Sequence, residues 1–217
     1  MTATADRHSF VIQNTQLLQV PLVPEIVLHL AHEAVPLWQK TEEELGELGL
    51  PPPFWAFAWA GGQALARHIL DNREVVTGRR VLDLASGSGL VAIAARLAGA
   101  LDVLAVDIDA FAAQAILINA SANNVQVDVK TANLLEMPPP FVDVILVGDL
   151  FYEKTLAAKL LEWLEQAQAK GVTVLIGDPG RSYLPREKLI SCAAYEVPVT
   201  RDLEDAEIKH TQVWKLG

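Results

Sequence analysis

The chain has 217 residues, which suits one domain of ordinary size with a short appendage. Hydrophobic residues make up 51% of it and charged residues 20%, so the sequence can bury a core and is not of the disordered class. Its 17 basic and 27 acidic side chains give a formal net charge of -10, which disfavours nucleic acid and anionic membranes as partners. A single cysteine, Cys192, excludes an internal disulfide and favours a reducing compartment; we expect it to be a small buried residue.

The first residues of the chain do not resemble a secretory signal and are too poor in arginine for a mitochondrial presequence. A membrane span needs about 18 uninterrupted apolar residues. The most apolar region, residues 89–119, is interrupted by four charged side chains, namely Arg96, Asp102, Asp107 and Asp109. We therefore expect a soluble protein in the cytoplasm.

Residues 1–50 differ in composition from the rest of the chain. They mix prolines with an acidic run, and we interpret them as an N-terminal extension of helix and irregular coil, ahead of one domain over residues 51–217. The run Pro51-Pro52-Pro53 at this boundary excludes a helix, because proline lacks the amide donor. His29 and His32 would share a helical face in the extension, but without a third ligand nearby we predict no metal site.

The main domain begins with a helix expected at residues 62–70, and from residue 80 apolar strands alternate with further helices. Strands are expected at residues 81–84, 103–106, 125–129, 142–147 and 172–176. The intervening helices are expected at residues 90–97, 110–121 and 156–168, with Asp109 as the N-cap of the second. Residues 195–199 and 208–214 are predicted to form a closing hairpin. This alternation indicates an α/β fold with a parallel sheet covered on both faces.

The turn after the first of these strands is rich in glycine, and reads Asp83-Leu-Ala-Ser-Gly87-Ser-Gly89. Glycines let a ligand approach the backbone, and the helix that follows offers amide donors. Gly87, Gly89 and Ala92 also fit a dinucleotide fingerprint. Asp83 argues against a dinucleotide, because a carboxylate repels a pyrophosphate and suits the ammonium group of S-adenosylmethionine. A tight turn that binds nothing is the structural alternative.

Polar residues also follow the next three strands. Asp107 is placed to accept hydrogen bonds from both ribose hydroxyls, although a helix cap is its alternative role. Asn133 follows the third strand, where an adenine contact or a plain loop residue is expected. Asp149 lies beside Phe151 and Tyr152, a combination that suits an amine pocket. Alternatively, Asp149 caps the next helix while Phe151 packs in the core.

These segments resemble a known group of enzymes. The glycine turn with its downstream acid is similar to class I S-adenosylmethionine-dependent methyltransferases, and Asp149-x-Phe151-Tyr152 is similar to their protein-lysine branch. From about residue 24 to residue 214 the chain resembles the electron transfer flavoprotein β-subunit lysine methyltransferases. The segments that carry this likeness are Phe54-Trp55-Ala56, Trp59, Gly61-Gly-Gln-Ala-Leu65, Leu70-Asp-Asn72, Asp107-Ile-Asp109 and Ile176-Gly-Asp-Pro-Gly-Arg181.

The resemblance implies a Rossmann-like, doubly wound, seven-stranded, mostly parallel sheet with a C-terminal antiparallel hairpin. It implies S-adenosylmethionine as the cofactor and lysine side chains of the electron transfer flavoprotein β subunit as the substrate. The cofactor residues would be Trp59, Asp83, Gly87, Gly89, Asp107, Asn133 and Gly148. The catalytic residues would be Asp149, Phe151 and Tyr152. Trp55, Phe57 and Trp59 could alternatively be aromatic core residues; we expect this of Phe57 and keep Trp59 in the wall of the cofactor site. The roles of Asp178 and Arg181, a salt-bridged turn or a substrate contact, stay open.

Two positions depart from the family pattern: Ala60 stands where relatives have proline, and Ala85 where a glycine is common. The mitochondrial members carry a targeting peptide. The first residues of this sequence do not resemble one, so the resemblance favours a bacterial member. Three rival functions remain. A small-molecule amine N-methyltransferase would share the cofactor; an NAD-dependent oxidoreductase would bind NADH, which Asp83 disfavours; a non-catalytic cofactor-binding adaptor would have no use for the Asp149 motif.

Overall fold

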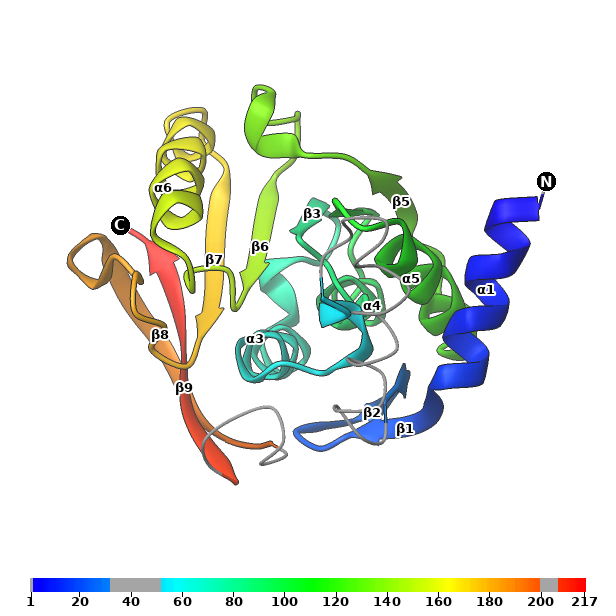
Figure 1. Cartoon of the computed structure of the whole chain (residues 1–217). Coiled ribbons are helices and arrows are strands. Elements are labelled where there is room, and N and C mark those ends of the chain that lie inside the picture. Colours follow the sequence, from blue (N-terminus) through cyan, green and yellow to red (C-terminus); the bar gives the residue numbers. More distant parts are fainter. Residues whose placement is uncertain (1, 32–51, 200–206) are drawn as a thin grey trace.

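The computed structural model describes residues 2–31, 52–199 and 207–217. Its centre is a seven-stranded sheet in the order β5-β4-β3-β6-β7-β9-β8 (Figure 1). The strands are β3 (Arg80–Leu84), β4 (Asp102–Asp107), β5 (Asp128–Thr131), β6 (Val144–Gly148), β7 (Thr173–Asp178), β8 (Leu189–Pro198) and β9 (Ile208–Leu216). The pairs among β3 to β7 are parallel, whereas β9 is antiparallel to both β7 and β8. The predicted mostly parallel sheet with its antiparallel hairpin is confirmed.

Helices cover both faces of this sheet. They are α3 (Ala60–Asp71), α4 (Leu90–Leu97), α5 (Ala110–Ala122) and α6 (Lys154–Gln168). Side chains of α3, α4 and α5 pack with one face in a buried cluster that includes Leu65, Ala95 and Ile116. The opposite face packs on α6 through Leu160 and Leu164. This two-sided arrangement is what the alternation of strands and helices predicted.

The N-terminal region differs from the expectation. A helix, α1 (Thr2–Asn14), is followed by an antiparallel hairpin of β1 (Gln16–Val20) and β2 (Val23–Leu30). The prediction of helix and coil is therefore wrong over the hairpin, and so is the helical placement of His29, which lies on β2. Ile26, Leu28 and Leu30 are buried at every second position and pack on α4 and α5. This two-residue period was the signal of a strand.

The remaining N-terminal expectations lie partly outside the described residues. His32, the acidic run and Pro51 fall there, and the division at residue 50 stays a prediction. In the described ranges no helix is long and apolar enough to span a membrane.

Several boundaries are corrected as well. β5 begins at Asp128, three residues later than expected, and β8 begins at Leu189, ahead of the predicted start. Cys192 is exposed rather than buried, because it lies on β8 at the edge of the sheet, beside an irregularity of the strand pairing. The predicted cap is confirmed, since the Phe111 amide donates to Oδ1 of Asp109 at 2.8 Å.

Candidate active site

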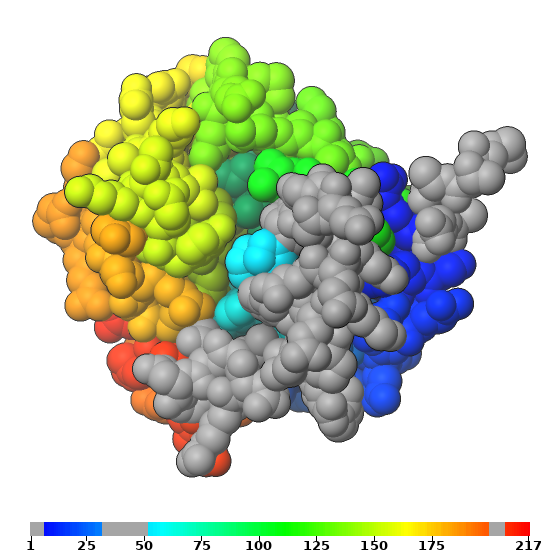
Figure 2. All heavy atoms as spheres, viewed as in Figure 1, coloured from blue at the N-terminus to red at the C-terminus, as the bar shows by residue number. Residues whose placement is uncertain are grey.

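A cavity of about 970 Å³ lies at the carboxyl ends of β3, β4 and β6. In parallel α/β sheets this edge is where ligands bind. In Figure 2 the segment at the start of α3 (cyan) reaches the surface beside α6 (yellow-green). Six of the seven predicted cofactor residues line the cavity: Trp59, Asp83, Gly87, Asp107, Asn133 and Gly148. Gly89 does not line it, but starts α4 and packs against Ile116.

The turn between β3 and α4 has an unusual backbone. Gly87 and Gly89 have φ of 55° and 85°, in the left-handed region that glycine adopts without steric cost. Ala85 also lies there, with φ of 53°, where an L side chain is strained. The left-handed backbone at this position therefore explains why a glycine is common there in the family. The turn brings its backbone to the cavity wall.

Asp83 anchors this turn from the end of β3. Its Oδ2 accepts hydrogen bonds from the Ser86 hydroxyl at 2.5 Å and from the Ala92 amide at 3.0 Å. Burial raises the pKa of Asp83 to about 7, with the two hydrogen bonds opposing and Asp107 adding to the rise. A buried carboxylate of this kind gains from a cation placed beside it. This property suits the ammonium end of an amino acid moiety.

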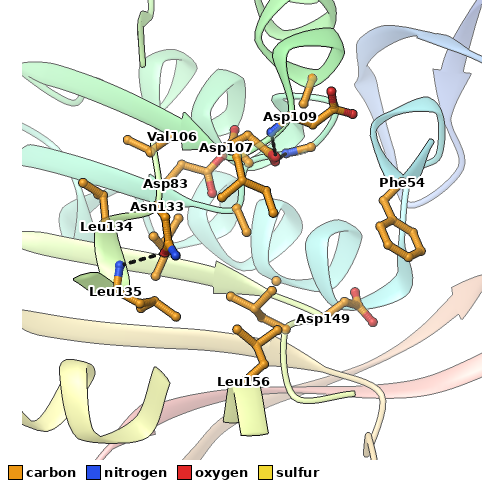
Figure 3. A pocket seen from close by; sticks show the side chains of 18 of the residues that line it. Phe54, Asp83, Val106, Asp107, Asp109, Asn133, Leu134, Leu135, Asp149 and Leu156 are labelled. Carbon is orange, nitrogen blue, oxygen red and sulfur yellow. Dashed lines mark hydrogen bonds between the residues drawn. The ribbon is translucent and has the colours of Figure 1, made fainter. Parts of the chain in front are cut away.

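Asp107 links the glycine turn to the next helix. Its Oδ2 accepts from the Gly87 amide at 2.9 Å and its Oδ1 from the Asp109 amide at 3.0 Å. Burial raises the pKa of Asp107. Each carboxylate oxygen has a second lone pair, so the residue can hold the turn and accept from hydroxyl groups at once. Figure 3 shows Asp83, Asp107 and Asp109 together, with Asp149 lying apart, towards Phe54.

Asn133 lies further along the wall. Its Oδ1 accepts from the Leu135 amide at 3.2 Å, and its Nδ2 donates to Glu136 at 2.9 Å. The side chain is exposed and borders the apolar wall made by Leu134 and Leu135 (Figure 3). An apolar wall with one amide is the pattern of a site for a planar base. The adenine contact stays a prediction.

Asp149 lies where the cavity meets the start of α3. Its Oδ2 accepts from the amides of Gly61, in a short hydrogen bond, and Gly62, at 3.2 Å. Its Oδ1 accepts from Nε and Nη2 of Arg181, at 3.1 and 2.8 Å. Burial raises the pKa of Asp149 to about 6, against the lowering effect of Arg181. Asp149 does not cap α6; that helix is capped by Glu153, which accepts from two amides of its first turn.

Aromatic residues surround this end of the cavity. Phe54, Trp59 and Tyr152 line it, and the Phe54 ring lies 5.9 Å from that of Trp59 and 6.0 Å from that of Tyr152. Phe151 is fully buried among core residues and does not belong to the lining. The structure therefore brings Asp149 and Tyr152 to the cavity and places Phe151 beneath it. Phe57 is buried, as expected.

Arg181 is held by the turn that follows β7. Asp178 Oδ1 accepts from the amides of Gly180, at 2.7 Å, and Arg181, at 2.6 Å. The guanidinium then lies 5.8 Å from the Trp59 ring centroid and reaches Asp149. The sequence left the roles of Asp178 and Arg181 open, and the structure makes Asp178 a turn residue and Arg181 part of the cavity wall. A basic residue directly after Gly-Asp-Pro-Gly was the available signal.

The wall fits S-adenosylmethionine. Among the described residues, the cavity lining contains seven acidic side chains against two basic ones, Lys159 and Arg181, so the site favours a cationic ligand. Asp83 and the glycine turn would hold its amino acid end, and Asp107 its ribose. The apolar wall beside Asn133 would accept its adenine. A dinucleotide, with two negative phosphates, does not suit this surface.

Known proteins are similar to the chain. The family model described as ribosomal protein L11 methyltransferase (PrmA) matches residues 63–177. The electron transfer flavoprotein beta subunit lysine methyltransferase of Danio rerio is 40% identical over 219 residues, covering 98% of this chain and 84% of the relative.

Solved structures show the same fold. A Thermoplasma acidophilum protein superposes with a TM-score of 0.57 at 18% identity, over 71% of this chain and 86% of its own. A tRNA (uracil-54, C5)-methyltransferase of Pyrococcus abyssi, solved with S-adenosyl-L-homocysteine, has a TM-score of 0.51 at 19% identity. It matches over 70% of this chain and 38% of its own.

The sheet order, the glycine turn with its two acids and these likenesses define a class I, S-adenosylmethionine-dependent methyltransferase. The predicted class and cofactor are confirmed, and the oxidoreductase and adaptor alternatives are wrong. Within this class, the chain belongs to the electron transfer flavoprotein β-subunit lysine methyltransferase family.

Proposed function

We propose that the protein transfers methyl groups from S-adenosylmethionine to lysine side chains of the electron transfer flavoprotein β subunit. The observation that carries this proposal is the placement of Asp149 beside Tyr152, Phe54 and Trp59 at one end of the cavity. A carboxylate among aromatic rings suits an amine at the end of an apolar stem. The Danio rerio and Xenopus laevis relatives, which are electron transfer flavoprotein beta subunit lysine methyltransferases, suggest the substrate.

The bound cofactor would supply an electrophilic methyl group, and the residues of this chain orient the amine. A lysine with a pKa of about 10.4 must lose its proton before it can attack, which costs about 4.6 kcal/mol at neutral pH. Asp149 alone would favour the ammonium form, so it is a poor general base. It can hold the incoming nitrogen in line and stabilise the positive charge that develops during transfer. The proton can leave to water.

The aromatic rim has a separate task. Phe54, Trp59 and Tyr152 would enclose the alkyl stem of the lysine and exclude water from the reacting nitrogen. The resemblance gave Phe151 this role as well. Its side chain is instead buried in the core, where it supports the segment that carries Asp149. We retain Asp149 and Tyr152 as the residues that contact the substrate amine.

A parallel assay with labelled S-adenosylmethionine tests this proposal. The candidate acceptors are purified electron transfer flavoprotein, ribosomal protein L11, which the matched family model suggests, and a small free amine such as N-acetyl-lysine methylamide. We expect label in the β subunit of the flavoprotein at the highest rate. Label in L11 alone would make it the substrate, and label in the free amine without either protein would favour the small-molecule alternative.

We also infer a cytoplasmic location. The exposed thiol of Cys192 supports it, because a single free cysteine on a surface persists best in a reducing compartment. Fractionation of the source cells with an antibody against the protein tests this inference, and recovery from another compartment would contradict it.

A further inference from the structure

Asp149 has no acceptor position left for a substrate amine in this structure. An ionised carboxylate offers about four lone-pair sites, two on each oxygen. Two amides of α3, from Gly61 and Gly62, donate to Oδ2, and two N–H groups of Arg181 donate to Oδ1. An amine can reach this carboxylate only if one of these donors leaves.

The two sets of donors differ in how firmly they are held. The amides belong to the first turn of α3, and the backbone of Gly61 there crosses that of Gly177 in direct contact. Asp149 is fixed to the same strand, since its own amide donates to the Gly177 carbonyl at 3.0 Å. The Arg181 guanidinium is instead the end of a flexible side chain that lines the cavity and is 22% exposed. It is the donor that can move.

The ionised carboxylate of Asp149 is stabilised by a cation at Oδ1. Asp149 is 9% exposed and Arg181 is its cationic partner among the described residues, and removing the cation from a buried ion pair is strongly unfavourable. Exchange of one cation for another avoids that penalty, because the lysine arrives at Oδ1 as an ammonium group while the guanidinium leaves, and it gives up its proton to water only afterwards, before the attack. The centroid of the Trp59 ring lies 5.8 Å from the guanidinium carbon, so the displaced guanidinium has an aromatic surface beside it.

We propose that Arg181 is a displaceable positioning residue, which occupies Oδ1 of Asp149 in the free enzyme and yields that oxygen to the target lysine. The inference rests on the proposed function in assigning the amine to Asp149. Arg181 keeps the carboxylate ionised and oriented between turnovers, and it competes with the substrate. Amines without the binding energy to displace it are therefore disfavoured, which selects a docked protein lysine over a free amine.

Kinetics of Arg181→Met give the first test. The charged side chains that act on Asp149 among the described residues are Arg181, which stabilises its ionised form, and Asp178, which destabilises it; α3 adds its amide dipoles. Without Arg181, Asp149 takes up a proton more readily, so the acid limb of kcat/KM moves to higher pH. At pH values high enough to ionise Asp149 in the variant, no guanidinium competes with the substrate lysine. There KM for the protein substrate should fall several-fold below that of the wild type.

Matched variants separate the loss of competition by Arg181 from damage to the fold. Arg181→Lys keeps a cation and should restore the acid limb in part. Lys188→Met removes an exposed cation between β7 and β8 that pairs with Glu165 and does not line the cavity, and it should change neither KM nor the pH profile. A KM that rises at every pH in Arg181→Met would mean that Arg181 is structural, and an unchanged KM and pH profile would mean that it never competes; either result overturns the proposal.

A spectroscopic readout is independent of turnover. The Nε–H resonance of Arg181, assigned by its loss in Arg181→Lys, is followed in protein saturated with S-adenosylhomocysteine. N-acetyl-lysine methylamide, added at a concentration high enough for mass action to replace the docking energy of a protein substrate, should shift it on binding, whereas the uncharged N-acetyl-norleucine methylamide should not. Equal shifts, no shift at saturation, or no binding of the lysine probe would overturn the proposal. A shift without methylation of any lysine acceptor would instead leave the displacement standing and refute the proposed function.

Discussion

Gly61, at the start of α3, and Gly177, at the end of β7, cross so closely that a Cβ on either residue would overlap the carbonyl oxygen of the other. This contact places the first amides of α3 against Asp149. It gives a physical reason for two of the sequence segments that carry the family likeness, Gly-Gly-Gln-Ala-Leu and Gly-Asp-Pro-Gly-Arg. Both contain a glycine that the crossing requires.

Gly61→Ala should therefore destabilise the protein by about 1–3 kcal/mol, because the added methyl meets backbone that can only yield by moving the helix. Gly62→Ala is the matched control, since its Cβ would find its nearest neighbours at 3.9 Å. Alanine is the better helix former, so this variant should be neutral or more stable by up to about 1 kcal/mol. Chemical denaturation of both proteins measures the difference, and equal stabilities would contradict the crossing.

Ala85→Gly should leave stability unchanged or raise it by up to about 1 kcal/mol. Ala85 has φ of 53°, a left-handed conformation that costs an L residue about 1–2 kcal/mol, and the entropy that glycine gains on unfolding offsets part of the benefit. Ala94→Gly, in the interior of α4, should lose about 1 kcal/mol or more. Thermal unfolding compares the two. A loss at position 85 as large as that at position 94 would rule out strain in the turn.

Cofactor affinity should fall as the pH is lowered through about 7. Burial raises the pKa of Asp83 to about 7, so below this pH the carboxyl is neutral in the free protein and must release a proton to bind a cation. The affinity for S-adenosylhomocysteine, which carries an ammonium group, should drop by up to about tenfold per pH unit. Calorimetry at pH 6 and pH 8 measures this drop.

Asp83→Asn separates the contribution of Asp83 from that of the other acids of the cavity. This variant should bind S-adenosylhomocysteine more weakly at pH 8, and its affinity should depend less on pH than that of the wild type. A wild-type affinity that is equal at both pH values would exclude Asp83 as the partner of the ammonium group.

The raised pKa of Asp83 has an opposite effect on the stability of the ligand-free protein. Since the pKa of Asp83 is higher in the folded than in the unfolded protein, the contribution of Asp83 to stability falls as pH rises between about 4 and about 7.

Asp149→Asn should abolish methyl transfer and leave the affinity for S-adenosylhomocysteine within a few fold. Asparagine keeps an oxygen for the amides of Gly61 and Gly62, but it lacks the charge that stabilises the attacking nitrogen. Asp149→Ala also leaves those amides without their acceptor, and should be the less stable of the two. Single-turnover assays and calorimetry give the two quantities. Equal losses of affinity and turnover would make Asp149 a structural residue.

Much of this site could be predicted from the sequence because its parts are local. The glycine turn and its acid lie within a few residues, and each strand end is marked by its apolar run. The ion pair between Asp149 and Arg181 could not be predicted, since these residues are brought together by the pairing of β6 with β7. The position of Phe151 could not be predicted either. The sequence shows an aromatic residue near an acid, but it does not show that the Phe151 side chain is buried in the core.

The β1–β2 hairpin was missed although its alternation is regular. Pro21 and Pro24 interrupt the pattern and suggested coil, yet Pro21 is in the turn and Pro24 is exposed on β2. A proline is tolerated where its missing amide would have faced away from the partner strand.

The proposed reaction is transfer of methyl groups to lysines of the electron transfer flavoprotein β subunit, with Asp149 orienting the lysine. The intact mass of the flavoprotein β subunit, recorded after incubation with S-adenosylmethionine and either wild-type enzyme or Asp149→Asn, tests it most directly. We expect a gain in methylene steps with the wild type, located on lysines by fragmentation, and none with the variant. An unchanged mass with cofactor-bound wild-type enzyme, or the same gain with Asp149→Asn, would contradict it.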